Sequence, residues 1–152
     1  MKKIIAHRGL LNGPDKNDEN RPEIIENALI QNFDVEIDLW FIDGKWLLGH
    51  DNPQYEIQQS FFERDNFWIH CKNFDALNKL NNSNYYFNYF WHDKDAYTLT
   101  SHNYIWAYPG STVKDRSIIV LPEKFMNLED IKAYDFYGVC TDYSCYVGEI
   151  LK

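Results

Sequence analysis

Two acidic residues are separated by a single residue in the stretch Glu36-Ile37-Asp38. Side chains alternate along a β-strand, so Glu36 and Asp38 would share one face while Ile37 takes the other. Two carboxylates held side by side repel each other unless a cation neutralises them. The spacing is compatible with a metal-binding pair, but taken alone it favours the other interpretation, an exposed edge strand of alternating charge.

A histidine and a lysine have the same spacing in His70-Cys71-Lys72. His70 and Lys72 would share a face, and burying both requires an anion or a metal ion nearby. The alternative is a surface strand with a lysine whose stem lies along apolar side chains. The apolar run at residues 67–69, directly before the pair, favours the buried interpretation.

Two further histidines each precede a charged residue, in His7-Arg8 and His50-Asp51. Histidine exchanges protons near neutral pH, and the planar guanidinium of Arg8 suits phosphate oxygens. A single histidine at a strand end is more often structural than catalytic. Two such pairs make acid–base chemistry a stronger candidate, and both the catalytic and the structural interpretation stay open.

These polar residues follow short apolar segments, which indicates buried strands that run into loops. Apolar residues at helical spacing begin after Pro22 and end before Asn32, and the order strand–helix–strand recurs. The alternation favours parallel β/α units in one α/β domain over residues 1–152, with a cleft where the strands end. Strands are expected at residues 4–6, 34–42, 45–49, 67–72, 85–91, 104–108, 117–121 and 138–141, and helices at 22–31, 74–80 and, for a turn or two, 127–133.

The length limits this architecture, because a complete (β/α)8 barrel usually takes ~250 residues and the chain has 152. We therefore expect an undersized, partly degenerate (β/α) TIM-type barrel, with several outer helices trimmed or missing. Apolar strand faces that no helix covers would be exposed to solvent. The chain is therefore also expected to form a homo-oligomer, in which a second copy covers them.

Charge and composition exclude several classes of function. The formal net charge is −8 without a cluster of lysines and arginines, which argues against nucleic acid as a partner. No apolar stretch approaches the ~20 residues of a membrane span. Cys71, Cys140 and Cys145 form no disulfide framework, and the N-terminal apolar run is too short for a signal peptide. We expect a cytoplasmic protein with reduced thiols.

Later strand ends carry side chains that suit a hydroxylated substrate group. Glu123 and Asp142 would accept hydrogen bonds from a glycerol or sugar hydroxyl, and Trp106 or Tyr108 would offer a stacking face. The alternative is that the rings belong to the core and that the acids are solvated.

The N-terminal third of the chain carries a five-part pattern, which consists of Ile5-Ala6-His7-Arg8-Gly9, Glu19-Asn20, Glu36-x-Asp38, Asp43-Gly44 and His50-Asp51. In order and spacing, this pattern resembles the N-terminal block of the glycerophosphodiester phosphodiesterase family. This family belongs to the phospholipase-C-like phosphodiesterases of the TIM-barrel superfamily. The resemblance is strong over residues 4–51 and weaker through Ile69-x-x-Lys72 and residues 138–143.

The resemblance implies a metal-dependent phosphodiester hydrolase with a divalent ion, Mg²⁺, Ca²⁺ or Mn²⁺, at the mouth of a barrel. Glu36 and Asp38 would be metal ligands by their positions in the pattern. His7 and His50 would be the general acid and base, with the assignment between them open.

The resemblance also implies how a small phosphodiester substrate is held. Arg8 would bind the phosphate, Lys72 would add positive charge to it, and Asn20 would form hydrogen bonds within the site. The nucleophile is left open between water and a substrate hydroxyl next to the phosphate, which would give a cyclic phosphate first. Glycerophosphodiesters, a lipid headgroup or a phosphate-linked polysaccharide all fit.

The sequence departs from the family at two positions. Where the family has a glutamate ligand two residues before the lysine, this chain has His70, which would complete the metal site with an imidazole. Two oxygens and one nitrogen shift the preference toward Mn²⁺, Co²⁺ or Zn²⁺. Arg21 stands where the family usually has a small hydroxyl residue, and it would contact phosphate or point into solvent.

Three other functions compete with this hypothesis. The first is a catalytically inactive barrel that binds phosphodiesters or sugar phosphates, which the His70 replacement and the short chain favour. The second is a metal hydrolase acting on amides, against which Arg8 and Lys72 argue because they suit an anion. The third is a subunit that acts only within an assembly. The trimmed barrel motivates this function, but it would leave the polar residues at the strand ends without a role.

Overall fold

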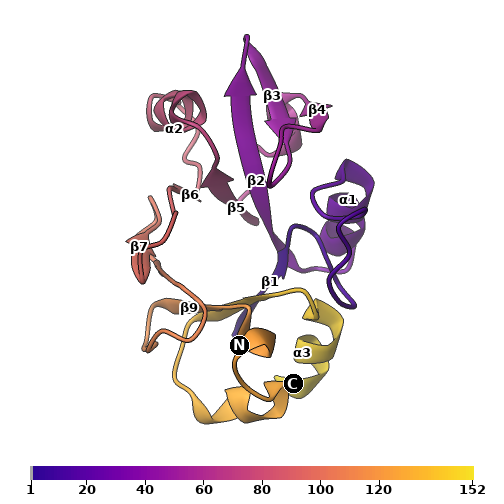
Figure 1. Cartoon of the computed structure of the whole chain (residues 1–152), viewed down its shortest axis with the longest axis vertical. Coiled ribbons are helices and arrows are strands. Elements are labelled where there is room, and N and C mark those ends of the chain that lie inside the picture. The colour runs from indigo at the N-terminus through magenta and orange to yellow at the C-terminus, as the bar shows by residue number, and fades with distance from the viewer. Residues whose placement is uncertain (1) are drawn as a thin grey trace.

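Figure 1 shows the computed structural model, which describes residues 2–152 as a curled sheet with helices around it. Within these residues, ten strands join one mixed sheet. The strands are β1 (Lys3–His7), β2 (Asp34–Ile42), β3 (Lys45–Leu48), β4 (Tyr55–Ile57), β5 (Phe67–Cys71), β6 (Tyr89–Phe90), β7 (Tyr97–Leu99), β8 (Ile105–Ala107), β9 (Ser117–Val120) and β10 (Gly138–Thr141). The helices are α1 (Pro22–Ile30), α2 (Phe74–Asn81) and α3 (Ser144–Ile150), with the 3-10 helices η1 (Gln59–Phe61), η2 (Pro122–Lys124) and η3 (Leu128–Ala133).

Parallel pairing dominates the sheet. Seven strands lie parallel in the order β6-β5-β2-β1-β10-β9-β8. β7 pairs antiparallel to β8 at one end of this row, and the antiparallel hairpin β3–β4 extends the second half of β2. The C-terminal ends of the parallel strands consequently lie along one edge, and the predicted α/β fold built on parallel strands is confirmed in this form.

The two ends of the row approach each other. The backbone N–H of Ser101, just after β7, donates to the carbonyl of Tyr89 at 2.8 Å, and the Ser101 hydroxyl accepts from the Tyr89 N–H at 2.9 Å. Trp106 on β8 lies with its ring centroid 4.5 Å from that of Phe90 and 6.1 Å from that of Trp68, which come from the other end of the row. The sheet is thus curled into a half-barrel, and no β-ladder joins β6 to β7 in the described part of the chain.

Alternation along the strands divides the core into two layers. The outer layer lies between sheet and helices, where α1 buries Ile25 and Ala28 and α3 buries Val147 and Ile150. Burying an isoleucine- or phenylalanine-sized side chain contributes roughly 1.5–3 kcal/mol to the free energy of folding, so both layers stabilise the curled sheet. The inner layer, within the curl, contains Ile5, Trp68, Phe90, Trp106, Ile118, Val120, Leu121 and Cys140.

Several crossovers are short, as the spacing of the strands predicted. Between β6 and β9 the described chain forms no helix, and the connection from β9 to β10 contains only η2 and η3. The strand expected over residues 85–91 is confined to Tyr89–Phe90. The outer face of β7 and β8 therefore has little cover, and Leu99 is 64% exposed.

Two strands and one α-helix were not predicted, namely β4, β7 and α3. Each of these two strands has only three residues, which is too short for the alternation of apolar and polar residues to be recognised as a strand. α3 contains Ser144, Val147 and Gly148, which are weak helix formers, and its N-cap side chain makes no hydrogen bond. Packing against β1 and β10 forms this helix despite its low propensity.

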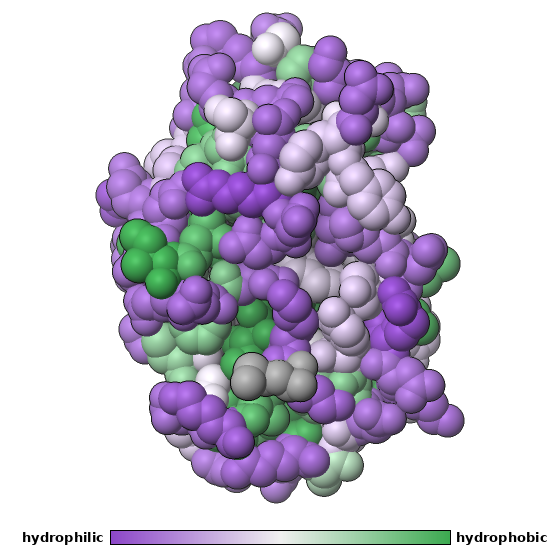
Figure 2. Space-filling view, turned by 180° about the vertical axis from the view of Figure 1, so that it is seen from behind, coloured by the Kyte–Doolittle hydropathy of each residue, from purple (hydrophilic) through white to green (hydrophobic). Residues whose placement is uncertain are grey.

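The surface is polar over much of its area. On the face opposite to that of Figure 1, hydrophilic residues predominate and apolar residues form separate patches (Figure 2). Among residues 2–152, no helix is both long enough and apolar enough to cross a membrane.

Candidate functional site

Parallel register brings four of the predicted site residues together at the C-terminal ends of β1, β2 and β5. His7 pairs with Glu36 across β1 and β2, and Asp38 pairs with His70 across β2 and β5. Both carboxylates are buried, with Glu36 2% and Asp38 0% exposed. The alternative of an exposed edge strand is wrong, because β2 lies between β1 and β5.

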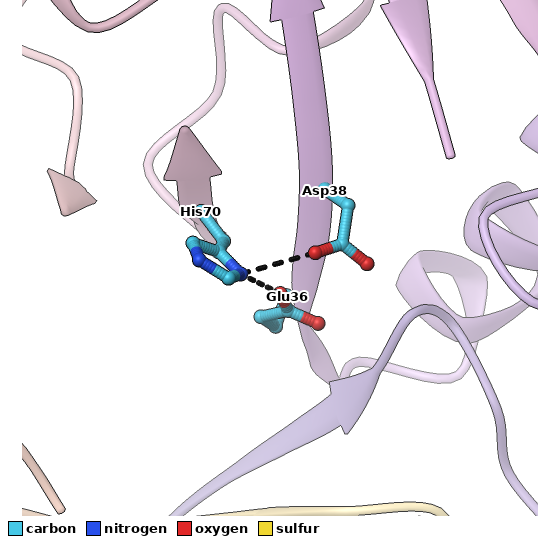
Figure 3. A group of neighbouring side chains, drawn as sticks. All are labelled: Glu36, Asp38 and His70. Atoms are coloured by element: carbon cyan, nitrogen blue, oxygen red, sulfur yellow. Dashed lines mark ion pairs between the residues drawn. The ribbon is translucent and has the colours of Figure 1, made fainter. Parts of the chain in front are cut away.

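Glu36, Asp38 and His70 form a cluster with metal-ligating chemistry (Figure 3). One ligand atom from each of the three residues lies within 4.8 Å of the others. His70 Nδ1 is 3.0 Å from Asp38 Oδ1 and 4.0 Å from Glu36 Oε1. The three predicted metal ligands thus point toward one another from two neighbouring strands.

The other ring nitrogen of His70 determines how the imidazole faces this cluster. Nε2 lies 2.9 Å from the carbonyl oxygen of His92, which only accepts hydrogen bonds, so Nε2 carries the proton. The ring also stacks on Phe90, with centroids 5.2 Å apart and planes at 6°. In its neutral form His70 therefore directs the Nδ1 lone pair at two carboxylates, as in metal sites where a carbonyl orients the histidine ligand.

The pKa values of Glu36 and Asp38 are shifted in opposite directions. Burial raises the pKa of Glu36, and the negative charge of Asp38 raises it further. Burial opposes ionisation of Asp38 as well, but the contact with His70 and the charges of Arg8 and Lys72 outweigh it and hold the pKa of Asp38 well below its ordinary range. Among the described residues, no donor reaches Asp38 Oδ1 with hydrogen-bond geometry, although His70 Nδ1 lies beside it.

Arg8 follows β1 in a left-handed turn, with φ of 54°, and its guanidinium lies over the acidic cluster. Its Nη1 donates to Glu19 at 2.7 Å, its Nε lies 3.1 Å from Asp38 Oδ2, and its backbone N–H donates to Glu36 at 3.1 Å. Burial lowers the pKa of Arg8, but the charges of Asp38, Glu36 and Glu19 outweigh burial and raise it overall. The predicted phosphate ligand is therefore at the site, where it is already paired with carboxylates.

Lys72 and His50 complete the rim around Asp38. Lys72 Nζ lies 3.7 Å from Asp38 Oδ1. His50 follows Gly49, whose N–H donates to the Asp38 carbonyl at 3.1 Å, and His50 Nδ1 lies 2.7 Å from Asp51 Oδ1. Burial lowers the pKa of His50, and of the nearby charges Asp38 raises it while Arg8 and Lys72 lower it, leaving it below its ordinary value.

His7 and the two later acids form a chain of contacts. His7 Nε2 lies 4.0 Å from Glu36 Oε2, while its Nδ1 is 2.6 Å from Asp142 Oδ1. Glu123 accepts hydrogen bonds from the Asp142 backbone N–H at 2.9 Å and from the Thr141 hydroxyl at 3.0 Å. Glu123 and Asp142 thus lie beside the site, with their carboxylates bonded to the protein.

The predicted stacking residues differ in exposure. Trp106 is 4% exposed and packs on Phe90 and Trp68, so it presents little surface to a ligand. Tyr108 is 49% exposed, and its ring centroid lies 5.9 Å from that of His92. Burial, with His70 next, lowers the pKa of His92.

Sequence reasoning placed His92 and Thr141 at strand ends expected to set specificity, but it gave neither residue a role in positioning other site residues. The carbonyl of His92 orients His70. The hydroxyl of Thr141 donates a hydrogen bond to the Glu123 carboxylate, which also accepts the backbone N–H of Asp142. The position of His92 at a strand end was a usable signal, but a backbone carbonyl carries no sequence signature. In comparisons with known proteins, no family model, no curated protein and no solved structure matches this chain.

Proposed function

We propose that this chain is a metal-dependent phosphodiester hydrolase, a shortened relative of the glycerophosphodiester phosphodiesterases with a partly degenerate TIM-type barrel. One observation carries the proposal, which is the cluster of Glu36, Asp38 and His70 within 4.8 Å at the strand ends. His7, Arg8 and Lys72 lie against its carboxylates, and His50 follows Gly49, whose N–H is bonded to the Asp38 carbonyl. This combination suits the cleavage of an anionic ester.

The three clustered residues fit a divalent cation. Within residues 2–152, Asp38 Oδ1 is buried without a hydrogen bond, and His70 presents its Nδ1 to the same space. A cation held by Glu36, Asp38 and His70 would relieve the repulsion between the buried carboxylates. Two oxygens and one imidazole nitrogen favour Mn²⁺, Co²⁺ or Zn²⁺ over Mg²⁺ or Ca²⁺. When bound, such an ion supplies Lewis acidity to a phosphate oxygen.

Arg8 and Lys72 bind and orient the phosphodiester. Both side chains are 16% exposed, so a ligand at the rim reaches them in a partly desolvated setting. Cations fixed in such a setting stabilise the negative charge that accumulates on phosphorus oxygens in the transition state. Asn20 contributes indirectly, because its side chain is fully buried against Asp38.

His7 and His50 transfer the protons. One imidazole takes the proton from the attacking hydroxyl while the other protonates the leaving alcohol oxygen as the P–O bond breaks. The nucleophile is water or a substrate hydroxyl next to the phosphate. Each histidine has a carboxylate partner on Nδ1, Asp142 for His7 and Asp51 for His50, which leaves Nε2 of each ring for proton exchange.

A barrel that binds phosphodiesters or sugar phosphates without cleaving them is the second candidate. It is favoured by the ion pairs of Arg8 with Glu19 and Asp38, because an arginine whose charge is already paired with two carboxylates has less capacity to stabilise a transition state. In this function the protonated His70 would pair with Asp38 and take the place of a cation.

Hydrolysis of bis(p-nitrophenyl) phosphate tests the proposal directly. The protein is expected to release p-nitrophenol with Mn²⁺, Co²⁺ or Zn²⁺ and to lose this activity in EDTA. Asp38→Asn is expected to abolish turnover, whereas Asp135→Asn, at an exposed site, should keep it. Full activity without metal would overturn the metal role. Phosphodiester binding without turnover under every metal would support the second candidate instead.

A further inference from the structure

The hydrogen bonds behind His7 point to a role for two acids that the sequence linked to substrate. Asp142 is 6% exposed, and its Oδ1 contacts His7 Nδ1 at 2.6 Å. A carboxylate that is mostly enclosed and already bonded to an imidazole has little surface left for a substrate hydroxyl. Its geometry is that of an acid that holds a histidine ring, as in catalytic triads.

The contact determines which nitrogen of His7 faces the site. An ionised carboxylate only accepts hydrogen bonds, so His7 Nδ1 carries the proton whenever the ring is neutral. Nε2, which lies 4.0 Å from Glu36 Oε2, is then the unprotonated nitrogen on the side of the carboxylate cluster. The same tautomer is required for proton exchange with a group bound there.

Glu123 in turn holds the backbone that carries Asp142. The chain leaves β9 through Leu121, whose φ of 47° is uncommon for a residue with a side chain, and η2 then begins at Pro122. This turn brings the Glu123 carboxylate to the end of β10. There one oxygen accepts the Asp142 N–H and the other accepts the Thr141 hydroxyl.

We propose that Asp142 and Glu123 are positioning residues for His7, linked in the order Glu123, Asp142, His7, and that neither is a substrate ligand. The proposal rests on the proposed function for its consequence in catalysis, but the arrangement itself can be measured without any turnover. Asp142 selects the tautomer and orientation of His7, and Glu123 fixes the loop from which Asp142 reaches the ring.

The first test is spectroscopic and uses the whole protein. With His7 signals assigned by comparison with His7→Gln, the ¹⁵N chemical shifts of a neutral histidine report which ring nitrogen carries the proton. Wild type is expected to show a protonated Nδ1 and a bare Nε2, and Asp142→Asn to lose this preference. A protonated Nε2 in the wild type would overturn the proposal, whether or not the protein hydrolyses anything.

The second test separates kcat from KM on bis(p-nitrophenyl) phosphate. Asp142→Asn is expected to lower kcat by roughly 100-fold or more, because the wrong tautomer cannot exchange its proton. Its KM should stay within about threefold of the wild-type value if no substrate contact is lost. Asp135→Asn, an exposed acid, is the matched control and should keep both constants.

Glu123 provides an independent variant if Asp142→Asn does not fold. Glu123→Ala is expected to lower kcat by roughly 10- to 100-fold through a misplaced Asp142. Glu123→Gln should recover most of this loss, because its amide oxygen still accepts the Asp142 N–H. A raised KM with unchanged kcat in either series would show substrate ligands and overturn the proposal. If the wild-type protein is inactive but its His7 shows the expected tautomer, the proposed function is wrong, whereas the positioning of His7 by Asp142 is supported.

Discussion

Asn20 holds Asp38 at two points. Its amide nitrogen donates to Asp38 Oδ2 at 2.9 Å, and its amide oxygen accepts the backbone N–H of Asp38 at 3.0 Å. Asn20 itself is fully buried in a left-handed conformation, with φ of 62°, and its N–H donates to the Arg8 carbonyl at 2.9 Å. One side chain therefore connects the loop after β1 to a proposed metal ligand on β2.

Replacing Asn20 is expected to destabilise the fold. Asn20→Ala leaves the Asp38 N–H and Oδ2 without this partner inside the protein, which costs about 1–3 kcal/mol for each unsatisfied group. Urea unfolding followed by circular dichroism measures the loss, with the exposed Asn84→Ala as control. Equal stability of the two variants would contradict this role for Asn20.

Removing either proposed proton-transfer residue should reduce turnover strongly. His7→Ala and His50→Ala are each expected to lose at least ~100-fold in rate, the usual scale for a general acid or base. His102→Ala is the control, because His102 stacks on Tyr86 just before β8, at the opposite edge of the sheet. Near-normal rates in a folded His7 or His50 variant would contradict the two-histidine mechanism.

Exchanging the imidazole ligand for a carboxylate should change the metal preference. His70→Glu creates an all-oxygen set, which favours Mg²⁺ and Ca²⁺ relative to Mn²⁺, Co²⁺ and Zn²⁺. Activity titrated with each ion measures the change, with His102→Glu as a control that adds the same charge elsewhere. An unaltered order of ions would show that His70 does not contact the metal.

Glu36 should make metal-free stability depend on pH. Burial and the charge of Asp38 raise its pKa above the ordinary value of 4.5, so the folded state holds this proton more tightly than the unfolded state. The resulting stability is fully present below pH 4.5 and is lost as pH rises through the folded-state pKa.

Thermal unfolding in EDTA over a pH series tests this dependence. Glu36→Gln should be more stable than wild type at neutral pH, and the difference should shrink or reverse under acidic conditions. Added Mn²⁺ should stabilise wild type and have little effect on the variant. Parallel pH curves for the two proteins would contradict the prediction, and Glu129→Gln controls for an exposed acid.

Oligomerisation stays a prediction that light scattering can test. Tyr97 and Leu99 on β7 are 47% and 64% exposed, and they line an apolar groove together with Ile105 and Val113. A mass above the 18.2 kDa of one chain is expected at micromolar concentration, and Leu99→Asp should reduce it. A wild-type monomer would contradict the prediction.

The local sequence pattern was enough to predict the main strands and which of the site residues share a face. The spacing of Glu36 and Asp38, and of His70 and Lys72, predicted their shared faces, because alternation along a strand is a property of the extended backbone itself. Short apolar runs located the main strands for the same reason. β4 and β7, with three residues each, were too short to carry this signal and were missed.

Tertiary structure alone decided what each polar group contacts. The register between β1 and β2 and between β2 and β5 brought four site residues together, although they stand up to 63 positions apart, from His7 to His70. The curl of the sheet buried Trp106 beneath the site, and the turn at Leu121 bonded Glu123 to the backbone of Asp142. Sequence specifies side-chain chemistry and local direction, whereas hydrogen-bond partners depend on distances that only the packed chain defines.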